Sequence, residues 1–528
     1  MLRNYPMIKH IALLLLLCCV HLCADSLIWE NPQILSTLGV NASNPRIGMD
    51  SSGDLVAAWI ENGVVMANTK LFKNSWNSPS IQVSDVGAVD LELAVDPAGN
   101  ATAIWSLNGV IQSASLPFNG TWDTPISLSI PGSSSPQIAV DSAGNFVAIW
   151  NCNGIIESAT KLLNNVWSAP PTPLSNPSMP SDSPQIAIGG GENIVAVWHT
   201  IWNGIDAIFS SSTTLNTPWP IYPSLVSTPN IRSVYPQIAV DSEGNPIAVW
   251  YRYDLAGTNY SNVYVQAVLG RPGGVWEVPT DLSSPGVMNP DSLTLHVAYN
   301  AYDMAFVLWT NCYNYTSFNL EGSVYATNAW IPVISFVTDN IYLYDQYFSI
   351  SSLGYAYGAY MAYDSSSNSP VIQTFKANTY QVSPNYGNMQ TISKTGTNGY
   401  PRIDGALVAD INYAASVWLN NNGSNSVVQV STGQTPILPA PTSLAVTQTA
   451  NNQGLFIEYY NTLSWQGSPP GTAANWTIYR NGVWAASVPV ETLQWIDHNA
   501  VQNQPCVYGV VLQETDGDYS QMSTVSFP

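Results

Sequence analysis

The chain has 528 residues, of which 9% are charged and 11% are aromatic, and its formal net charge at pH 7 is −21. This length exceeds that of one ordinary hydrophobic core and indicates several domains or one large repetitive domain. Nucleic acids and anionic membranes are bound through clustered positive charge, and the 13 Lys and Arg residues form no cluster. We therefore expect no nucleic-acid partner.

Residues 1–26 predict a signal peptide. The basic residues Arg3 and Lys9 precede the apolar run 11–20, and the small residues Ala24 and Ser26 follow it, as in secretory signals. The run is shorter than the ~18 residues of a membrane span, and no later apolar run reaches that length. We expect a mature chain without a membrane span that is secreted or held in the cell envelope, in the periplasm or on the outer surface.

A motif that ends in an aromatic residue recurs between residues 27 and 432. Subtraction of residue numbers places the anchors 45 to 59 residues apart, which is near the period of four-stranded propeller blades. In the third copy, four short runs with strand-like alternation are separated by turn residues: 136–141, 145–150, 154–160 and 166–175. The anchors are Trp59, Trp105, Trp150, Trp198, Trp250, Trp309, Tyr360 and Trp418.

The start of the repeat region predicts how the ring closes. The segment "IWENPQILS" (28–36) matches the fourth strand of other copies, such as "TWDTPISLS" (121–129), whereas the copy around Trp418 stops after three strands. The N-terminal strand should therefore complete the last blade and remove an exposed sheet edge. The count is eight blades; seven is the alternative, because "FSISSLGYAYGAY" (348–360) replaces the motif in one copy.

The repeated "VDSAGN"-type segments predict hairpin turns. Asp141 can accept hydrogen bonds from the following backbone amides, and Gly144 can adopt the left-handed conformation of a tight turn. The spacing of carboxylates does not suit an EF-hand-like Ca²⁺ loop. Cys152, Cys312 and Cys506 are far apart, and we find no zinc motif, phosphate-binding loop or dinucleotide fingerprint, so no metal or cofactor is expected.

Two resemblances follow from these motifs. Residues 28–431, through the repeated VDxxGNxxAVW pattern, resemble the repeat β-propellers of secreted bacterial proteins. After a Pro-rich linker at 433–440, residues 441–528 resemble a fibronectin type III domain, although Cys506 stands where that family usually has a tyrosine. The prediction is an all-β chain: a propeller over 27–432, closed by its N-terminal strand, and a C-terminal β-sandwich.

One polar position recurs near the start of the innermost strand of each copy. These side chains would line one mouth of the central channel and could bind an anionic or polyhydroxylated ligand. The alternative is that they only satisfy backbone groups around a water-filled channel. The residues are Arg46, Glu92, Gln137, Gln185, Gln237, His296, Tyr347 and Arg402.

A second recurring position is a tryptophan at the start of the outermost strand. Repeated exposed indoles could stack on sugars and bind them multivalently. Alternatively, they clasp adjacent blades. The residues are Trp76, Trp122, Trp167, Trp276 and Trp330.

These patterns favour an exported, monomeric, non-catalytic binding or adhesion protein whose propeller surface binds a carbohydrate or protein partner. No catalytic residue is assigned. The first alternative is a carbohydrate-active hydrolase, sialidase-like or another glycoside hydrolase, with its site at the channel mouth; it requires two carboxylates facing one another. The second alternative is a structural component of the envelope.

Overall fold

The computed structural model divides the chain into two compact units, Trp29–Gln434 and a second unit that holds the strands from Thr442 onward. The structure describes residues 28–162, 166–253, 261–287, 294–300, 303–312, 318–326, 328–331, 333–337, 344–350, 355–364, 369–378, 390–393, 405–410, 413–421, 425–434, 440–452, 457–469, 473–480, 483–498, 500–502, 504–514, 520 and 523–527.

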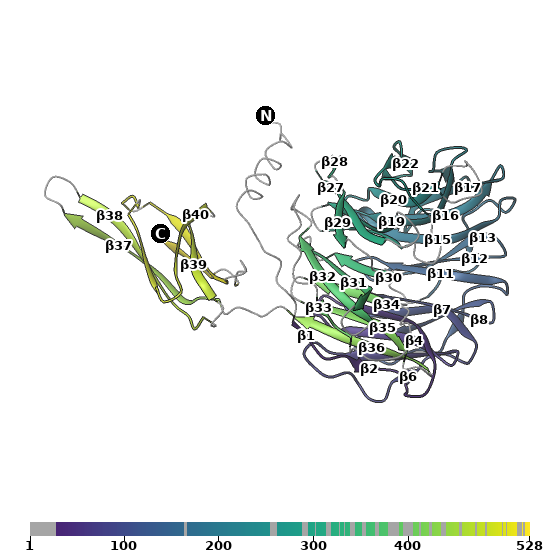
Figure 1. The fold of residues 1–528 in the computed structure, drawn as a ribbon, viewed down its shortest axis with the longest axis horizontal. Coiled ribbons are helices and arrows are strands. Elements are labelled where there is room, and N and C mark those ends of the chain that lie inside the picture. The colour runs from purple at the N-terminus through teal and green to yellow at the C-terminus, as the bar shows by residue number, and fades with distance from the viewer. Residues whose placement is uncertain are drawn as a thin grey trace. The chain divides into compact units, whose positions relative to one another are not determined.

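The larger unit is a succession of antiparallel sheets that follow one another along the chain (Figure 1). Three regular four-stranded sheets come first: β3 (Ala42–Met49), β4 (Leu55–Glu61), β5 (Val64–Lys70), β6 (Ile81–Gln82); β7 (Ala88–Val95), β8 (Ala101–Leu107), β9 (Val110–Leu116), β10 (Ile126–Ser127); β11 (Ser133–Val140), β12 (Phe146–Cys152), β13 (Ile155–Lys161), β14 (Thr172–Pro173).

The next two sheets have longer central strands, and the 3₁₀ turn Gly190–Glu192 joins the first two strands of the earlier one. Their strands are β15 (Ser181–Ile188), β16 (Asn193–Trp202), β17 (Ile205–Thr214), β18 (Ser224–Leu225); β19 (Arg232–Val240), β20 (Pro246–Tyr253), β21 (Ser261–Arg271), β22 (Val275–Trp276), β23 (Thr280–Asp281), β24 (Gly286–Val287).

Three further sheets complete the unit. They comprise β25 (Leu295–Tyr299), β26 (Ala305–Cys312), β27 (Phe318–Ala326), β28 (Ala329–Trp330), β29 (Ile334–Val337); β30 (Tyr344–Ile350), β31 (Tyr355–Asp364), β32 (Ser369–Asn378), β33 (Gln390–Thr391); and β34 (Gly405–Asp410), β35 (Tyr413–Asn421), β36 (Ser426–Gln434) with β1 (Ile28–Trp29) and β2 (Gln33–Ile34).

The first strands of successive sheets contact one another in a closed circle. The contacts run from β3 through β7, β11, β15, β19, β25, β30 and β34, and β34 contacts β3 again. The predicted closure is also confirmed, because β1 and β2 both pair with β36. Gln33 lies opposite Val430 and Ile34 lies opposite Gln429. The N-terminal strands therefore cover the edge that β36 would otherwise expose.

The anchor residues form the core between sheets. The side chains of all eight anchors are 0% or 1% exposed. Trp250, for example, shares one apolar cluster with Val195 and Val197 of the preceding sheet. Its indole Nε1 donates to Gln266 Oε1, directly opposite on the third strand, over 3.1 Å. Trp250 thus packs two sheets together and satisfies its polar atom within its own sheet, whereas the buried indole Nε1 of Trp105 makes no hydrogen bond.

The Asp-Gly turns form as the sequence predicts. Asp141 Oδ1 accepts hydrogen bonds from the backbone N–H groups of Ala143 at 2.9 Å and Asn145 at 2.8 Å. Gly144 has a φ of 85°, in the left-handed region that favours glycine. Asp96 and Asp241 bind their own turns in the same way. These carboxylates are used to close hairpins.

A bulge recurs in the first strand of five sheets. The pairing of that strand with the second strand shifts, and one residue in each bulge has a φ between 47° and 55°. Regular pairing resumes at the residue that was predicted to line the channel, for example at Gln137, opposite Ile149. The bulge therefore sets the direction of the strand just before each channel position. The residues with positive φ are Asn44, Asp90, Ser135, Ser183 and Tyr235.

The smaller unit contains two antiparallel sheets that share one apolar core. One sheet has the order β37 (Thr442–Asn452), β38 (Ile457–Gln466), β41 (Gln494–Asp497); the other has the order β40 (Val483–Pro489), β39 (Ala473–Arg480), β42 (Cys506–Glu514), β43 (Ser523–Phe527). The core brings Trp465 of the first sheet against Trp476 of the second, with ring centroids 6.0 Å apart. This is a β-sandwich, as predicted.

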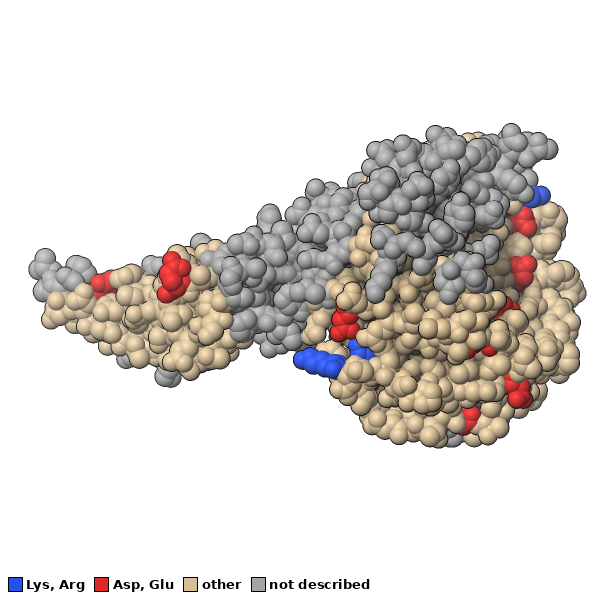
Figure 2. Space-filling model, turned by 60° about the horizontal axis from the view of Figure 1, so that its bottom comes forward, with Lys and Arg blue, Asp and Glu red and all other residues tan. Residues whose placement is uncertain are grey.

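On the face in Figure 2, charged side chains are scattered among uncharged ones, and some acidic side chains lie beside a basic one. No helix in the part of the chain that the structure describes is long and apolar enough to cross a membrane.

Candidate functional site

Three of the predicted channel residues contact one another. Arg46 donates from Nε to Glu92 Oε2 and from Nη2 to Glu92 Oε1, both at 3.0 Å. Gln137 Nε2 lies 3.4 Å from the same Oε1. The guanidinium group is therefore held by a bidentate ion pair between neighbouring sheets. This arrangement directs Arg46 toward a carboxylate of the protein itself.

The remaining channel residues have separate surroundings. His296 Nε2 lies 2.7 Å from the carbonyl oxygen of Gln346. Burial lowers the pKa of His296, and this backbone hydrogen bond only partly opposes the effect. Its ring lies 6.1 Å from that of Tyr347. Gln185 and Gln237 are partly buried at the equivalent positions, and Arg402 lies outside the described residues.

The outer tryptophans connect neighbouring sheets. Trp167 Nε1 donates to Ser113 Oγ at 3.2 Å, and Trp276 Nε1 donates to Ser210 Oγ at 2.7 Å; each serine belongs to the preceding sheet. The others are partly buried against apolar clusters: Trp76, Trp122 and Trp330. These contacts favour the interpretation that the outer tryptophans pack adjacent sheets together.

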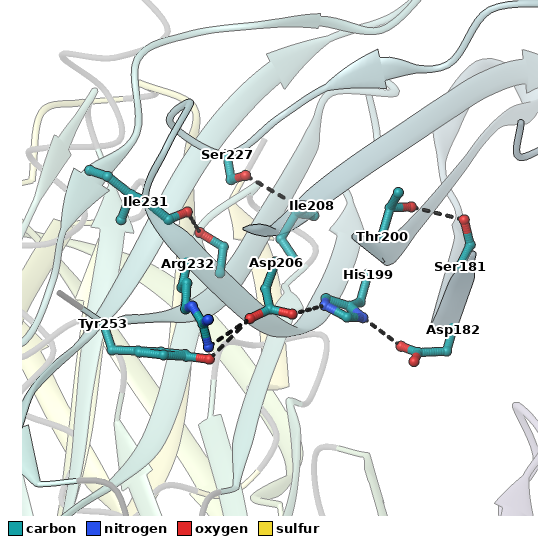
Figure 3. Close-up of polar contacts among 11 residues, drawn as sticks. Ser181, Asp182, His199, Thr200, Asp206, Ile208, Ser227, Ile231, Arg232 and Tyr253 are labelled. Atoms are coloured by element: carbon teal, nitrogen blue, oxygen red, sulfur yellow. Dashed lines mark hydrogen bonds and ion pairs between the residues drawn. The ribbon is translucent and has the colours of Figure 1, made fainter. Parts of the chain in front are cut away.

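A polar cluster that sequence analysis missed lies between the β15–β18 sheet and the sheet that begins with β19 (Figure 3). His199 on β16 is at its centre. Its Nδ1 lies 2.8 Å from Asp182 Oδ1 on β15, and its Nε2 lies 3.0 Å from Asp206 Oδ1 on β17. From the next sheet, Tyr253 donates its hydroxyl to Asp206 Oδ2 at 3.2 Å, and Arg232 Nη1 lies 3.5 Å from the same oxygen.

This cluster forms on a hairpin that is longer than the hairpin in the preceding sheet. β16 and β17 have ten residues each, whereas β12 and β13 in the preceding sheet have seven. The pairing of Ile201 with Asp206 and of Trp202 with Ile205 belongs to the added length. Asp206 therefore occurs at a position that the shorter hairpins lack. Asp182 and His199 face each other in the register of β15 with β16.

The hydrogen bonds define the charge of the histidine. A carboxylate only accepts hydrogen bonds, so both ring nitrogens of His199 must carry protons to satisfy both partners. Burial of the ring acts to lower the pKa of His199, but the bonds and charges of Asp182 and Asp206 outweigh it and hold the pKa above 6.5. The hydrogen bond from His199 lowers the pKa of Asp182, and burial opposes it. The cluster thus holds a protonated imidazole between two carboxylates.

The side chains of this cluster differ in their exposure to solvent. The side chain of Asp182 is 59% exposed, whereas those of His199 and Asp206 are 13% and 21% exposed. Burial raises the pKa of Tyr253, although its interaction with Arg232 works in the other direction, so this hydroxyl keeps its proton and donates it. Asp182 is therefore the member of this cluster that is most open to solvent, and His199 lies directly behind it.

The sequence contains one indication of this cluster, which is a departure from the repeat. The residue after the anchor is Ile60, Ser106 or Asn151 in the three preceding sheets and His199 in this one. In the register of the strands, Asp182 takes the place of Ser134. Among these four sheets, only this one carries ionisable residues at both positions, and such a departure marks a candidate site. The common pattern of the copies does not contain this signal, because it lies in the differences between them.

Neither a protein-family model nor a curated protein matches the chain. Among solved structures, it is similar to an α-L-arabinofuranosidase from Fusarium graminearum (11% identity, 78% of this chain and 97% of the other, TM-score 0.35). It is also similar to an α-L-arabinanase from Penicillium chrysogenum (12% identity, 77% and 98%, TM-score 0.36) and to an ulvan lyase (9% identity, 78% and 94%, TM-score 0.42).

These comparisons correct two predictions from the sequence. A non-catalytic binding or adhesion protein was expected, and no enzymatic activity, whereas the similar structures are carbohydrate-active enzymes. The physical reason for the error is that sequence analysis looked for paired carboxylates at one repeated blade position. In the structure, the two carboxylates come from different strands and meet through His199.

Proposed function

We propose that the chain is a carbohydrate-active hydrolase and that Asp182, His199 and Asp206 are its acid–base group. The observation that carries this proposal is the imidazole of His199 held between two carboxylates, one of them open to solvent. The group lies where two sheets meet, on β15, β16 and β17.

Hydrolysis of a glycosidic bond requires a proton for the leaving oxygen and a base for the attacking water. His199 supplies the proton from Nδ1 to the oxygen as the bond from that oxygen to the anomeric carbon breaks. The water oxygen bonds to the anomeric carbon, and its proton passes to Asp182. Transfer of this proton from Asp182 to His199 restores the starting state.

The other members hold the imidazole in place. Asp206 accepts from Nε2 and so favours the charged ring and fixes its orientation. Tyr253 and Arg232 bind the second oxygen of Asp206. Because they belong to the neighbouring sheet, the packing of the two sheets determines where the proton donor points.

The remaining assignments are proposals for the context of this activity. Residues 1–26 act as a signal peptide, and the mature monomer works outside the cytoplasm on a carbohydrate. Residues 27–432 form an eight-bladed propeller, 433–440 a linker and 441–528 a fibronectin type III-like module. The orders β37-β38-β41 and β40-β39-β42-β43 support the last assignment.

The test is a screen of purified protein against neutral and acidic polysaccharides, with release of reducing ends as the signal. Asp182→Asn is assayed beside the wild type to exclude a contaminating enzyme. We expect cleavage by the wild type that Asp182→Asn loses, with water incorporated at the new reducing end. Products that carry a new carbon–carbon double bond would show elimination, and equal activity of the variant would remove Asp182 from the site.

A further inference from the structure

Tyr235 combines a strained backbone with an exposed aromatic ring. Its φ is 55°, and its side chain is 50% exposed. A bulky residue in the left-handed region is a conformational outlier, and such outliers concentrate at functional sites. The strain has to be maintained by the surrounding structure, so the presence of tyrosine at this position requires an explanation.

The bulge does not require an aromatic residue. The same backbone conformation occurs at Asn44, Asp90, Ser135 and Ser183 in four other sheets. Asn and Asp are the residue types that tolerate this conformation best. A small polar residue would therefore satisfy the fold of β19 at lower conformational cost, and the tyrosine side chain contributes something other than the turn.

The position of Tyr235 connects it with the acid–base group. Tyr235 follows Arg232 by three residues on β19, and β19 contacts β15, which carries Asp182. Asp182 directly precedes the bulge residue Ser183, the counterpart of Tyr235 on β15. The two bulges thus occupy equivalent places on neighbouring first strands, on both sides of the contact between the sheets.

We propose that Tyr235 stacks against a sugar ring of the bound carbohydrate, next to the bond that is cleaved. This inference rests on the proposed hydrolase function and adds a binding residue to it. An aromatic face suits the C–H groups of an uncharged sugar ring, and the phenol hydroxyl can exchange hydrogen bonds with sugar hydroxyls. Both sheets then contribute to one site: β15–β17 provide the acid and the base, and β19 holds the sugar.

The test compares Tyr235→Asn with Tyr235→Phe. Asparagine fits the bulge, as Asn44 does, but removes the ring, whereas phenylalanine keeps the ring. For Tyr235→Asn we expect KM to rise about tenfold, the equivalent of one lost favourable contact, with kcat nearly unchanged and a higher melting temperature. Tyr235→Phe should keep KM close to the wild-type value.

Tyr222→Asn is the matched control, since Tyr222 is 85% exposed and precedes the outermost strand β18. It should leave KM and kcat unchanged. If Tyr235→Asn raises the melting temperature but leaves KM unchanged while His199→Gln abolishes cleavage, the stacking proposal is wrong and the hydrolase proposal stands. If the wild type neither cleaves nor binds any carbohydrate, both proposals are wrong.

Discussion

Asp182 and His199 lie opposite each other in the pairing of β15 with β16, and their side chains are joined by a contact of 2.8 Å between Oδ1 and Nδ1. The backbone register therefore places a proton donor next to a base before any substrate arrives. Because the two groups shift each other's pKa in opposite directions, the pair is charged over a wide pH range.

The first prediction concerns the pH dependence of activity. His199 must be protonated to act as the acid, and its pKa is held above 6.5, so activity should fall only as the pH rises above that value. Asp182 must be ionised, and its pKa lies below 3.8, so the acid limb should lie below that value. The measurement is kcat/KM against pH. An alkaline limb at or below pH 6.5 would contradict the role of His199.

The second prediction concerns stability at alkaline pH. Lys161 is 2% exposed, and its Nζ donates to Thr102 Oγ1 and Ser115 Oγ. Burial lowers the pKa of Lys161 to about 8, although Asp123 and Asp96 act to raise it. Between pH 8 and 10.5 the folded protein has lost this proton and the unfolded chain keeps it, so the contribution of Lys161 to stability increases with pH.

The size of this effect is about 3 kcal/mol, at about 1.4 kcal/mol for each pKa unit. Urea unfolding of the wild type and of Lys161→Met at pH 7.5 and pH 10.5 measures it. The advantage of the wild type over the variant should be larger at the higher pH. Lys70→Met, at the equivalent end of β5, is the control for loss of a buried lysine chain. A constant difference between wild type and Lys161→Met would contradict the assignment.

The third prediction concerns ring closure. Removal of residues 27–37 takes away β1 and β2 and exposes the edge of β36. It also removes the Ser36 hydroxyl that accepts from the buried backbone N–H of Val428 at 2.8 Å. We expect the deletion to aggregate and to unfold at a lower temperature, as followed by light scattering and calorimetry. A monomeric product with wild-type heat stability would show that these strands are dispensable.

The fourth prediction separates the channel from the active site. Glu92→Gln removes the bidentate ion pair between Glu92 and the Arg46 guanidinium group and should cost about 1–2 kcal/mol of stability. The double variant Arg46→Met/Glu92→Gln should recover part of this loss. Denaturant unfolding measures both values. Cleavage of the polysaccharide should remain at the wild-type rate in the double variant. A large loss of kcat would indicate that the catalytic residues lie at the channel mouth.

Local patterns in the sequence were sufficient for the architecture. The alternation around Trp150, the turn at Asp141 and the unpaired fourth strand at residues 28–36 each depend on contacts within one sheet or on a repeated packing position, and the structure has all three. The residues predicted to line the channel could be aligned between the copies from the same repeated pattern. Whether Arg46 binds a ligand or Glu92 depends on side-chain geometry between sheets, which periodicity does not contain.

The acid–base group could not be derived by the same reasoning. Asp206 lies in a lengthened hairpin, so no equivalent position exists in the shorter copies. Arg232 and Tyr253 reach Asp206 from the next sheet, and this contact depends on the packing of β19 and β20 against β17. Only the isolated His199 after the anchor was visible in the sequence.

The central claim is that His199 is the proton donor of a carbohydrate hydrolase. The most direct measurement is kcat/KM of His199→Gln on the best polysaccharide, beside His498→Gln, whose histidine makes a similar 2.9 Å contact with Glu458 in the smaller unit. We predict a loss of about 10²–10⁴-fold for His199→Gln, typical of a missing general acid, and no loss for His498→Gln. A folded His199→Gln protein with wild-type kcat/KM would contradict the claim.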